Sequence, residues 1–295
     1  MTYSTRRSAL ITGSEGFLGQ HLKSKLNKLN WDVTCWDVKV WSRDVQQVAN
    51  FDRRVDVVFH LAGVTREENF VNDLINSYDI NICGTQAVLN YCKKANSKCV
   101  FASTSGVYKT SNALRKVDES FQVMPSRPYS ISKFIAENLC RHFAEDLNVP
   151  SISLRIFNVF GEGQKEPFLV PYVINRLIKG KSVALRMPEA IRDFVYVEDV
   201  IDAMIKAGNH NNKTFGLYNI GTGIPTRIID FLHVAEEIFE KKTKVKIVGA
   251  KPGELHSMVA NNSKAIRELG WKANFDLQAG LLSMKHSIEK NGSLI

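Results

Sequence analysis

A tyrosine and a lysine four residues apart form the pair in this sequence best suited to proton transfer. Tyr129 and Lys133 stand directly behind Pro128, in a stretch, 129–147, with helical periodicity. Spacing of i and i+4 places the phenol and the ammonium on one face of a helix. Because a nearby cation stabilises a phenolate, we expect the pKa of Tyr129 to fall below its ordinary value of about 10. Tyr129 is therefore a candidate acid and base near neutral pH.

Two hydroxyl groups precede this pair in the sequence. Thr104 and Ser105 follow an apolar run, 98–102, that predicts a strand. Residues at the carboxyl end of a parallel strand face the crevice in which ligands bind. Because a Tyr–Lys spacing alone recurs by chance, the predicted site depends on this second feature.

Three glycines with the spacing GxxGxxG separate another apolar run, 9–12, from an amphipathic stretch, 18–29. They belong to the segment Gly13-Ser14-Glu15-Gly16-Phe17-Leu18-Gly19. A turn without side chains lets backbone amides approach a pyrophosphate at the positive end of the following helix. The general dinucleotide fingerprint is GxGxxG, so the next strand must support the prediction.

An acidic residue gives that support at the end of the next predicted strand. Asp37 follows Trp36, where a carboxylate can accept both ribose hydroxyls of an adenosine. The same charge repels a 2′-phosphate, so the sequence predicts NAD and makes NADP less favoured. Lys39 and Arg43 are close enough in the sequence to soften this preference.

Short β-branched runs alternate with amphipathic stretches up to about residue 160, which predicts βαβ units around a parallel sheet. The expected strands are 9–12, 33–36, 55–60, 98–102 and 151–156, and the expected helices are 18–29, 81–94 and 129–147. Beyond Gly161, glycines and prolines interrupt the pattern and indicate a smaller lobe. Two strand-like runs, 193–197 and 217–220, are expected to return to the sheet. The predicted fold is α/β, a Rossmann-type doubly wound parallel sheet with a smaller carboxyl-terminal lobe.

Composition excludes several classes of function. The net charge of +9 suits anionic partners, but the longest basic cluster is Lys241-Lys242-Thr243-Lys244, so we expect no nucleic acid. No apolar run approaches the length of a membrane span, and no segment resembles a signal peptide. Five cysteines without close spacing predict free thiols in the cytoplasm, and scattered histidines predict no metal site.

Taken together, these motifs resemble the extended short-chain dehydrogenase/reductase family, also called the NAD-dependent epimerase/dehydratase family. Besides the glycine loop and the Tyr129–Lys133 pair, the resemblance rests on 56–63 (DVVFHLAG), 81–85 (NICGT), 154–161 (LRIFNVFG), 192–200 (RDFVYVEDV) and 218–223 (YNIGTG). It implies an NAD-binding Rossmann domain, 1–164 plus 194–220, and a nucleotide-sugar-binding lobe, 165–193 plus 221–295. It also implies a homodimer through the helices that begin near Asn81 and Tyr129.

The resemblance assigns roles to individual residues. It implies catalysis by Thr104, Tyr129 and Lys133. Substrate is expected at Thr104, Ser105, Asn158 and Arg192, the last gripping a phosphate. The implied cofactor residues are Gly13, Gly16, Phe17, Leu18, Gly19, Asp37, Leu61, Ala62, Gly63, Asn81 and Lys133.

The residues after Thr104 narrow the expected reaction. Dehydratases of the family carry an Asp-Glu pair there, and its decarboxylases carry a glutamate, whereas this chain has Ser105 and Gly106. A 4-epimerase needs no further acid, because it returns hydride from the same cofactor to the opposite face of a 4-keto intermediate. A nucleotide-4-keto-deoxysugar reductase using NAD(P)H is the alternative, since the tail 258–262 (MVANN) resembles such enzymes. A dehydratase or decarboxylase, or a protein that binds dinucleotide without turnover, is less favoured.

Three departures from the family pattern leave the nucleobase and the sugar open. The family's usual VYG is Val107-Tyr108-Lys109, and its Gly-Asp-Gly before the RDF motif is Met187-Pro188-Glu189-Ala190. Its common Arg-Pro-Gly is Lys251-Pro252-Gly253.

Overall fold

The computed structural model describes residues 6–38, 44–109, 114–249 and 257–291. Its contacts divide the chain into two compact units. Unit 1 consists of Met1–Tyr108, Val123–Arg155 and Ile201–Tyr218, and unit 2 of Lys109–Gln122, Ile156–Val200 and Asn219–Ile295. The domain boundaries expected from the sequence stay a prediction: an NAD-binding domain of 1–164 plus 194–220 and a substrate-binding lobe of 165–193 plus 221–295.

A six-stranded parallel sheet with the strand order β11-β6-β4-β3-β1-β2 organises unit 1. Its strands are β1 (Ser8–Thr12), β2 (Asp32–Trp36), β3 (Val57–His60), β4 (Lys98–Thr104), β6 (Ser151–Ile156) and β11 (Phe215–Ile220). The buried runs of β-branched residues that predict these strands fit a sheet covered on both faces. The predicted fold class is confirmed.

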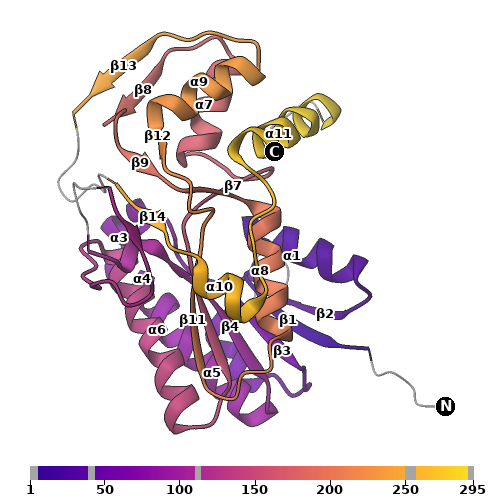
Figure 1. Cartoon of the computed structure of the whole chain (residues 1–295). Helices are drawn as coiled ribbons and strands as arrows, with labels where there is room; N and C mark the ends of the chain where they lie inside the picture. The colour runs from indigo at the N-terminus through magenta and orange to yellow at the C-terminus, as the bar shows by residue number, and fades with distance from the viewer. Residues whose placement is uncertain (1–5, 39–43, 110–113, 250–256, 292–295) are drawn as a thin grey trace. The chain divides into compact units, whose positions relative to one another are not determined.

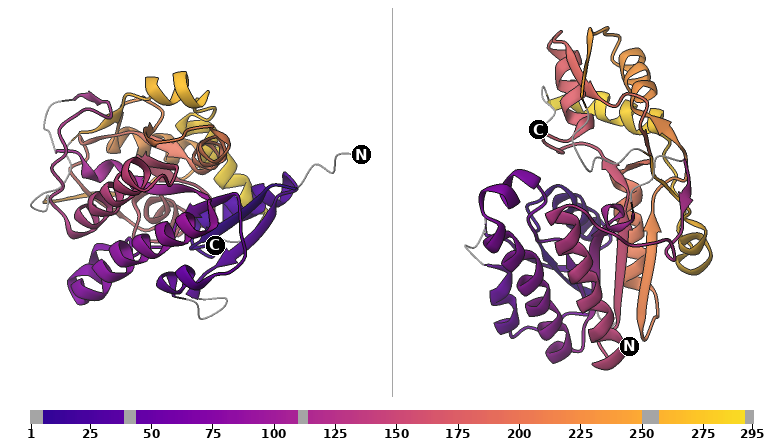
Figure 2. Two further views of the ribbon diagram at one scale, coloured as in Figure 1. Left: turned by 90° about the horizontal axis from the view of Figure 1, so that it is seen from below. Right: turned by 90° about the vertical axis from the view of Figure 1, so that its left-hand side faces the viewer.

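Helices cover both faces of this sheet (Figure 1). They are α1 (Phe17–Lys28), α5 (Gly84–Ala95), α6 (Pro128–Asp146) and α8 (Val197–Asn209), with short helical turns η1 (Val45–Asn50), η2 (Asp79–Cys83) and η3 (Ser105–Val107). The short helices α3 (Glu67–Asn72) and α4 (Leu74–Tyr78) pack against α6 and η2, respectively. On one face α5 and α6 run side by side (Figure 2). On the other face Gly208 of α8 lies against Phe59 of β3, so close that a Cβ there would be 2.9 Å from the ring.

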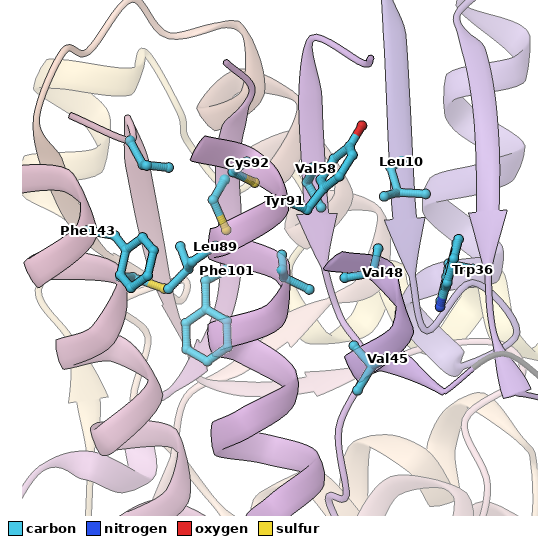
Figure 3. Packing of buried hydrophobic residues seen from close by; sticks show 14 of the residues in the cluster. Leu10, Trp36, Val45, Val48, Val58, Leu89, Tyr91, Cys92, Phe101 and Phe143 are labelled. Carbon is cyan, nitrogen blue, oxygen red and sulfur yellow. The ribbon is translucent and has the colours of Figure 1, made fainter. Parts of the chain in front are cut away.

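The core under α5 and α6 is formed by every second side chain of the strands, those that point to this face of the sheet. Leu10, Val58 and Phe101 point from β1, β3 and β4 into one cluster, where they meet Leu89 of α5 and Phe143 of α6 (Figure 3). Successive residues of a strand point to opposite faces, so their neighbours fill the core on the other side. These apolar contacts hold α6 against β4.

Unit 2 is built from short strand pairs instead of one sheet. The pairs are β7 (Asn158–Phe160) with β10 (Phe194–Tyr196), β8 (Val183–Arg186) with β13 (Val245–Val248), β9 (Ile191–Arg192) with β12 (Thr226–Arg227), and β5 (Lys116–Val117) with β14 (Val259–Ala260). Its helices are α7 (Leu169–Ile178), α9 (Ile228–Ile238), α10 (Ser263–Leu269) and α11 (Leu277–Asn291).

One strand expected in the main sheet lies elsewhere. The run 217–220 does belong to it, as part of β11, but the run 193–197 forms β10, which pairs with β7 in a separate two-stranded sheet. A tight turn explains the difference, because the Val159 N–H donates to the Phe157 carbonyl at 2.8 Å directly after β6. The chain bends there, and β10 follows the bent segment.

Candidate active site

The loop between β1 and α1 has no room for side chains at two of its glycines. Gly13 has a φ of +72°, and a Cβ there would lie 2.7 Å from the Ala62 nitrogen. A Cβ at Gly19 would lie 2.1 Å from the Gly13 carbonyl oxygen. Gly16 is the N-cap of α1, so no side chain caps the first N–H groups of that helix. Such a bare helix start fits a pyrophosphate, which the backbone amides would bind.

Asp37 lies beside this loop, as its place after β2 predicts. Its carboxylate accepts a hydrogen bond from the Glu15 N–H at 3.0 Å, and the side chain is 8% exposed. The residue therefore meets the loop at the edge where an adenosine ribose would follow the pyrophosphate. Lys39 and Arg43 lie outside the described residues.

The segment after β3 meets α6 through Asn81. A Cβ at Gly63 would lie 2.9 Å from Asn81 Oδ1 and 3.7 Å from Lys133 Nζ. Asn81 Nδ2 donates to Ser132 Oγ at 2.8 Å, and Asn81 Oδ1 accepts from the Val64 N–H at 2.7 Å. The amide of Asn81 thus connects this segment to α6 through hydrogen bonds. Leu61, Ala62, Gly63, Asn81 and Lys133, predicted to contact cofactor, belong to this one part of unit 1.

The three predicted catalytic residues also come together. Thr104 ends β4, and its hydroxyl oxygen accepts from the Gly106 N–H at 3.1 Å. The side chains of Thr104 and Tyr129 are hydrogen-bonded to each other. Lys133, one helical turn along α6, is 4% exposed, and its Nζ donates to the Ala102 carbonyl at 2.9 Å. A phenol, a hydroxyl and an ammonium therefore converge between β4 and α6.

Burial sets the proton affinities of this group. Burial raises the pKa of Tyr129 to about 12. The nearby Glu67 carboxylate also raises this pKa, whereas the hydrogen bond with Thr104 lowers it. Burial also lowers the pKa of Lys133 to about 8. The prediction that Lys133 lowers the pKa of Tyr129 is wrong here, because desolvation of the phenolate dominates and the ammonium bonds to Ala102.

The predicted substrate residues belong to both units. Ser105 opens η3 in unit 1, where its carbonyl accepts from the Tyr108 N–H. Asn158 is exposed at the start of β7 in unit 2, and its N–H donates to the Asp193 carbonyl. Arg192, in β9 of the same unit, donates from Nη1 to the Ile191 carbonyl at 3.1 Å. Substrate binding by these residues stays a prediction.

Sequence reasoning missed a buried ion pair beside the predicted catalytic residues. Glu137 of α6 bonds to Arg155 of β6 and to Ser103 of β4. Two signals were available in the sequence: Glu137 follows Lys133 at i+4, and Arg155 is the one charged residue of the predicted strand 151–156. The sequence alone does not say that these two charges meet.

Within residues 6–38, 44–109, 114–249 and 257–291, no group of three or more His, Cys, Asp or Glu side chains is arranged to hold a metal ion. Among the same residues, no helix combines the length and apolar character needed to cross a bilayer.

Comparisons with known proteins identify relatives of the chain. A putative UDP-glucose 4-epimerase from Methanocaldococcus jannaschii is 29% identical, over 96% of this chain and 98% of that protein. A trifunctional UDP-glucose 4,6-dehydratase/UDP-4-keto-6-deoxy-D-glucose 3,5-epimerase/UDP-4-keto-L-rhamnose reductase from Arabidopsis thaliana is 25% identical, over 93% of this chain and 46% of that protein.

Solved structures share the fold. The UDP-glucose 4-epimerase of Thermotoga maritima, crystallised with UDP-glucose, superposes with a TM-score of 0.90 over 97% of this chain and all of that chain, at 24% identity. The sequence model of the NAD-dependent epimerase/dehydratase family matches residues 9–221. Because this match covers more than half of the sequence and contains the glycine loop and the Tyr129–Lys133 pair, the chain belongs to the NAD-dependent epimerase/dehydratase family.

Proposed function

We propose that the protein interconverts the C4 epimers of a nucleotide-diphosphate sugar, with NAD held through each turnover. One observation carries the proposal: Tyr129 bonds to Thr104, while no acid follows at Ser105 or Gly106. A Cβ at Gly106 would lie 2.6 Å from Ser130 Oγ, so this position has no room for a carboxylate unless Ser130 moves. The site therefore suits a reaction that needs a single acid–base group.

Tyr129 would act as a phenolate to take the proton of the sugar 4-hydroxyl, and would later return it. Because burial raises the pKa of this phenol to about 12, the proposal requires the positive charges of Lys133 and of bound NAD to stabilise that phenolate. When bound, NAD supplies the acceptor and then the donor of the C4 hydride. Because that hydride would come back to the opposite face of C4, protons and electrons would balance without an external reductant. Thr104 would hold the phenol through their hydrogen bond, and Lys133 would orient the nicotinamide ribose.

The remaining predicted contacts complete the proposal. Gly13, Gly16, Phe17, Leu18, Gly19 and Asp37 would hold the adenosine diphosphate half of NAD, since the bare start of α1 and the carboxylate lie together. Arg192 would bind a phosphate of the substrate, because a guanidinium can donate two parallel hydrogen bonds to two phosphate oxygens. Ser105 and Asn158 would contact the sugar or the diphosphate.

A second candidate is the reduction of a nucleotide-4-keto-deoxysugar. The trifunctional Arabidopsis relative includes a UDP-4-keto-L-rhamnose reductase, and such a reaction would need the same Thr104, Tyr129 and Lys133. The two candidates differ in their need for reductant. An epimerase regenerates its own cofactor, whereas a reductase consumes one NAD(P)H in each turnover.

The assay that separates them starts with the purified protein and no added nucleotide. UDP-glucose, UDP-galactose and their N-acetyl forms are incubated with it, and the products are identified by chromatography. Interconversion without added cofactor supports the epimerase, and NAD released by denaturation gives its stoichiometry. Turnover of a 4-keto-6-deoxy sugar nucleotide that consumes NADPH, with no epimer formed, replaces the first candidate by the second.

Replacement of the phenol tests the role of Tyr129. Tyr129→Phe is expected to lower kcat by about a thousandfold while NAD still binds, because it removes only the proton-transfer group. The matched control is Tyr91→Phe, which removes another hydroxyl of unit 1, one that donates to the Arg53 carbonyl. The control should lose a little stability and keep its kcat. Comparable rates for the parent and Tyr129→Phe would refute the assignment.

We also propose a cytoplasmic homodimer that pairs through α5 and α6. The family resemblance supports the dimer, and the adjacency of the two helices provides a continuous face. The five cysteines, all free thiols, fit a reducing compartment. Sedimentation of the parent and of Ile135→Glu tests the dimer, because Ile135 is an exposed apolar residue of α6. A monomeric parent would refute it.

A further inference from the structure

A doubly hydrogen-bonded ion pair lies buried behind the catalytic residues of unit 1. Arg155 Nε and Nη2 donate to Glu137 Oε2 and Oε1 at 3.0 and 2.5 Å. Each side chain is 3% exposed. Two parallel bonds between a guanidinium and a carboxylate fix both the distance and the relative orientation of the groups. The pair therefore locks one geometry between α6 and β6.

Two further contacts extend the pair to β4 and to the turn after it. Ser103 Oγ donates to Glu137 Oε2 at 2.8 Å. The Arg155 guanidinium stacks over the ring of Tyr108, 4.6 Å from its centre. We name Ser103, Tyr108, Glu137 and Arg155 the buried cluster. Its members come from β4, from the residue after η3, from α6 and from β6.

Members of the buried cluster are neighbours of the proposed catalytic residues. Ser103 precedes Thr104, and Glu137 is one helical turn beyond Lys133. Tyr108 closes the η3 turn, in which the Gly106 N–H donates to the Thr104 hydroxyl. The contacts that assemble the site, Lys133 with Ala102 and Tyr129 with Thr104, cross the same interface between α6 and β4.

Stability is a poor explanation for a buried ion pair. Desolvating two charges costs several kcal/mol, and replacing such a pair by apolar residues is often neutral or stabilising. An apolar contact would hold α6 to β4 with less directional precision. The directional bonds therefore point to a requirement for exact placement.

We propose that Glu137 and Arg155 are positioning residues, which fix α6 against β4 so that Tyr129 and Lys133 meet Thr104 in the reactive arrangement. The inference deepens the proposed function and rests on the assignment of these three residues. Neither Glu137 nor Arg155 is proposed to touch the substrate. Their effect passes through Ser103 and through the turn of α6 between Lys133 and Glu137.

The test replaces both charges at once. The double variant Glu137→Met with Arg155→Met leaves no unpaired buried charge, and it is expected to melt at or above the temperature of the parent. Its kcat should fall by about tenfold to a hundredfold, the range that misplacement of reacting groups produces. KM should stay nearly constant, because the substrate contacts remain. A folded double variant with the kcat of the parent would overturn the proposal.

A milder pair of variants guards against a double variant that fails to fold. Ser103→Ala removes the hydroxyl that links β4 to Glu137. The control, Ser97→Ala, removes another buried hydroxyl: Ser97 lies just before β4, and its hydroxyl donates to the Val55 carbonyl. Ser103 and Ser97 are 3% and 1% exposed, so the two substitutions are matched. Ser103→Ala should lower kcat at constant KM, and Ser97→Ala should not. Equal kcat values for the two variants would contradict the positioning role.

A measurement without turnover separates this inference from the proposed function. Hydrogen exchange of the Gly106 amide reports whether Thr104 keeps its place, because that amide bonds to the Thr104 hydroxyl. Exchange should accelerate in Ser103→Ala and in the double variant, and not in Ser97→Ala. If the parent acts on no sugar nucleotide, the proposed function fails, yet the exchange still decides the positioning. Unchanged exchange in folded variants overturns the inference by itself.

Discussion

Unit 1 and unit 2 satisfy their buried backbone groups in different ways. In unit 1 the main sheet pairs strand with strand, and apolar side chains hold the helices on it. In unit 2, buried carboxylates join segments far apart in the sequence. Asp193 accepts hydrogen bonds from the N–H groups of Thr222, Gly223 and Ala260, and Asp199 accepts from those of Asn274 and Phe275.

This difference decides how far each unit can be predicted. A sheet ladder follows from a repeating apolar pattern that is visible in the sequence. A carboxylate that collects backbone N–H groups leaves no periodic trace, because its partners are ordinary residues in distant loops. Unit 1 should therefore tolerate the loss of a single polar group better than unit 2.

The largest effect on stability is expected from Asp193→Asn. The amide keeps the shape of the side chain but removes a charge. Its NH2 group replaces one carboxylate oxygen, so a donor faces either the Thr222 N–H or the N–H groups of Gly223 and Ala260. Hydrogen bonds to a charged group are the stronger kind, so the free energy of unfolding should fall by about 3 kcal/mol. Urea denaturation measures it.

The same experiment, with a control variant, tests whether unit 2 depends on its buried carboxylates independently of unit 1. Asp230→Asn is the control, since Asp230 bonds to Arg227 on the surface of unit 2, and it should change stability much less. NAD binding depends on unit 1 and should persist in Asp193→Asn at room temperature. Loss of NAD binding at full stability would show that the two units cannot be treated separately.

Acid should destabilise unit 1 through His60. The buried ring lies between Thr12 at 2.8 Å and Thr85 at 3.0 Å, and burial lowers its pKa to about 3. The unfolded chain takes up this proton near pH 6.5 and the folded chain near pH 3, so stability falls as the pH drops through this window. From pH 7 to pH 5 the loss from this group is about 2 kcal/mol.

Urea denaturation at both pH values, on the parent and two variants, measures this loss. His60→Gln retains polar partners for both threonines and should remove this part of the pH dependence. His142→Gln is the control, because His142 pairs with Asp146 on the exposed face of α6. An identical pH dependence in the parent and in His60→Gln would contradict the assignment.

The smallest effect that we predict is a difference in stability between alanine substitutions at two glycines with nearly the same φ angle. Gly13 in unit 1 has a φ of +72°, and Gly163 in unit 2 has a φ of +77°. Alanine at either position is strained, but a Cβ meets the Ala62 backbone at 2.7 Å only at Gly13, while Gly163 has nothing within 4 Å. Gly13→Ala should therefore cost at least about 1 kcal/mol more than Gly163→Ala.

Thermal melts of the two alanine variants give this difference, and NAD titrations extend it. Only Gly13→Ala should weaken NAD binding, because only that glycine belongs to the loop before α1. Equal losses of stability and of affinity in the two variants would mean that close packing at Gly13 is unimportant.

Much of unit 1 could be predicted from residue patterns. The expected strand 9–12 and helix 18–29 match β1 and α1 to within one residue at each end, since apolar runs and glycines mark those boundaries. The loop glycines, Asp37 and the Tyr129–Lys133 pair were found for the same reason, because they are local in sequence. Placement of the run 193–197 in the main sheet was wrong, because the turn at Phe157 depends on the surrounding tertiary structure.

The sequence by itself determined which residues could carry proton transfer and where a bare loop precedes a helix, since both are features of spacing. Only the tertiary structure decided their chemical state. Burial, which spacing does not encode, raises the pKa of Tyr129 instead of lowering it. Lys133 bonds to the carbonyl of Ala102, a residue 31 positions away, and Glu137 meets Arg155 across 18 positions. Such contacts arise only when α6 packs on β4 and β6, so their physical origin is the fold itself.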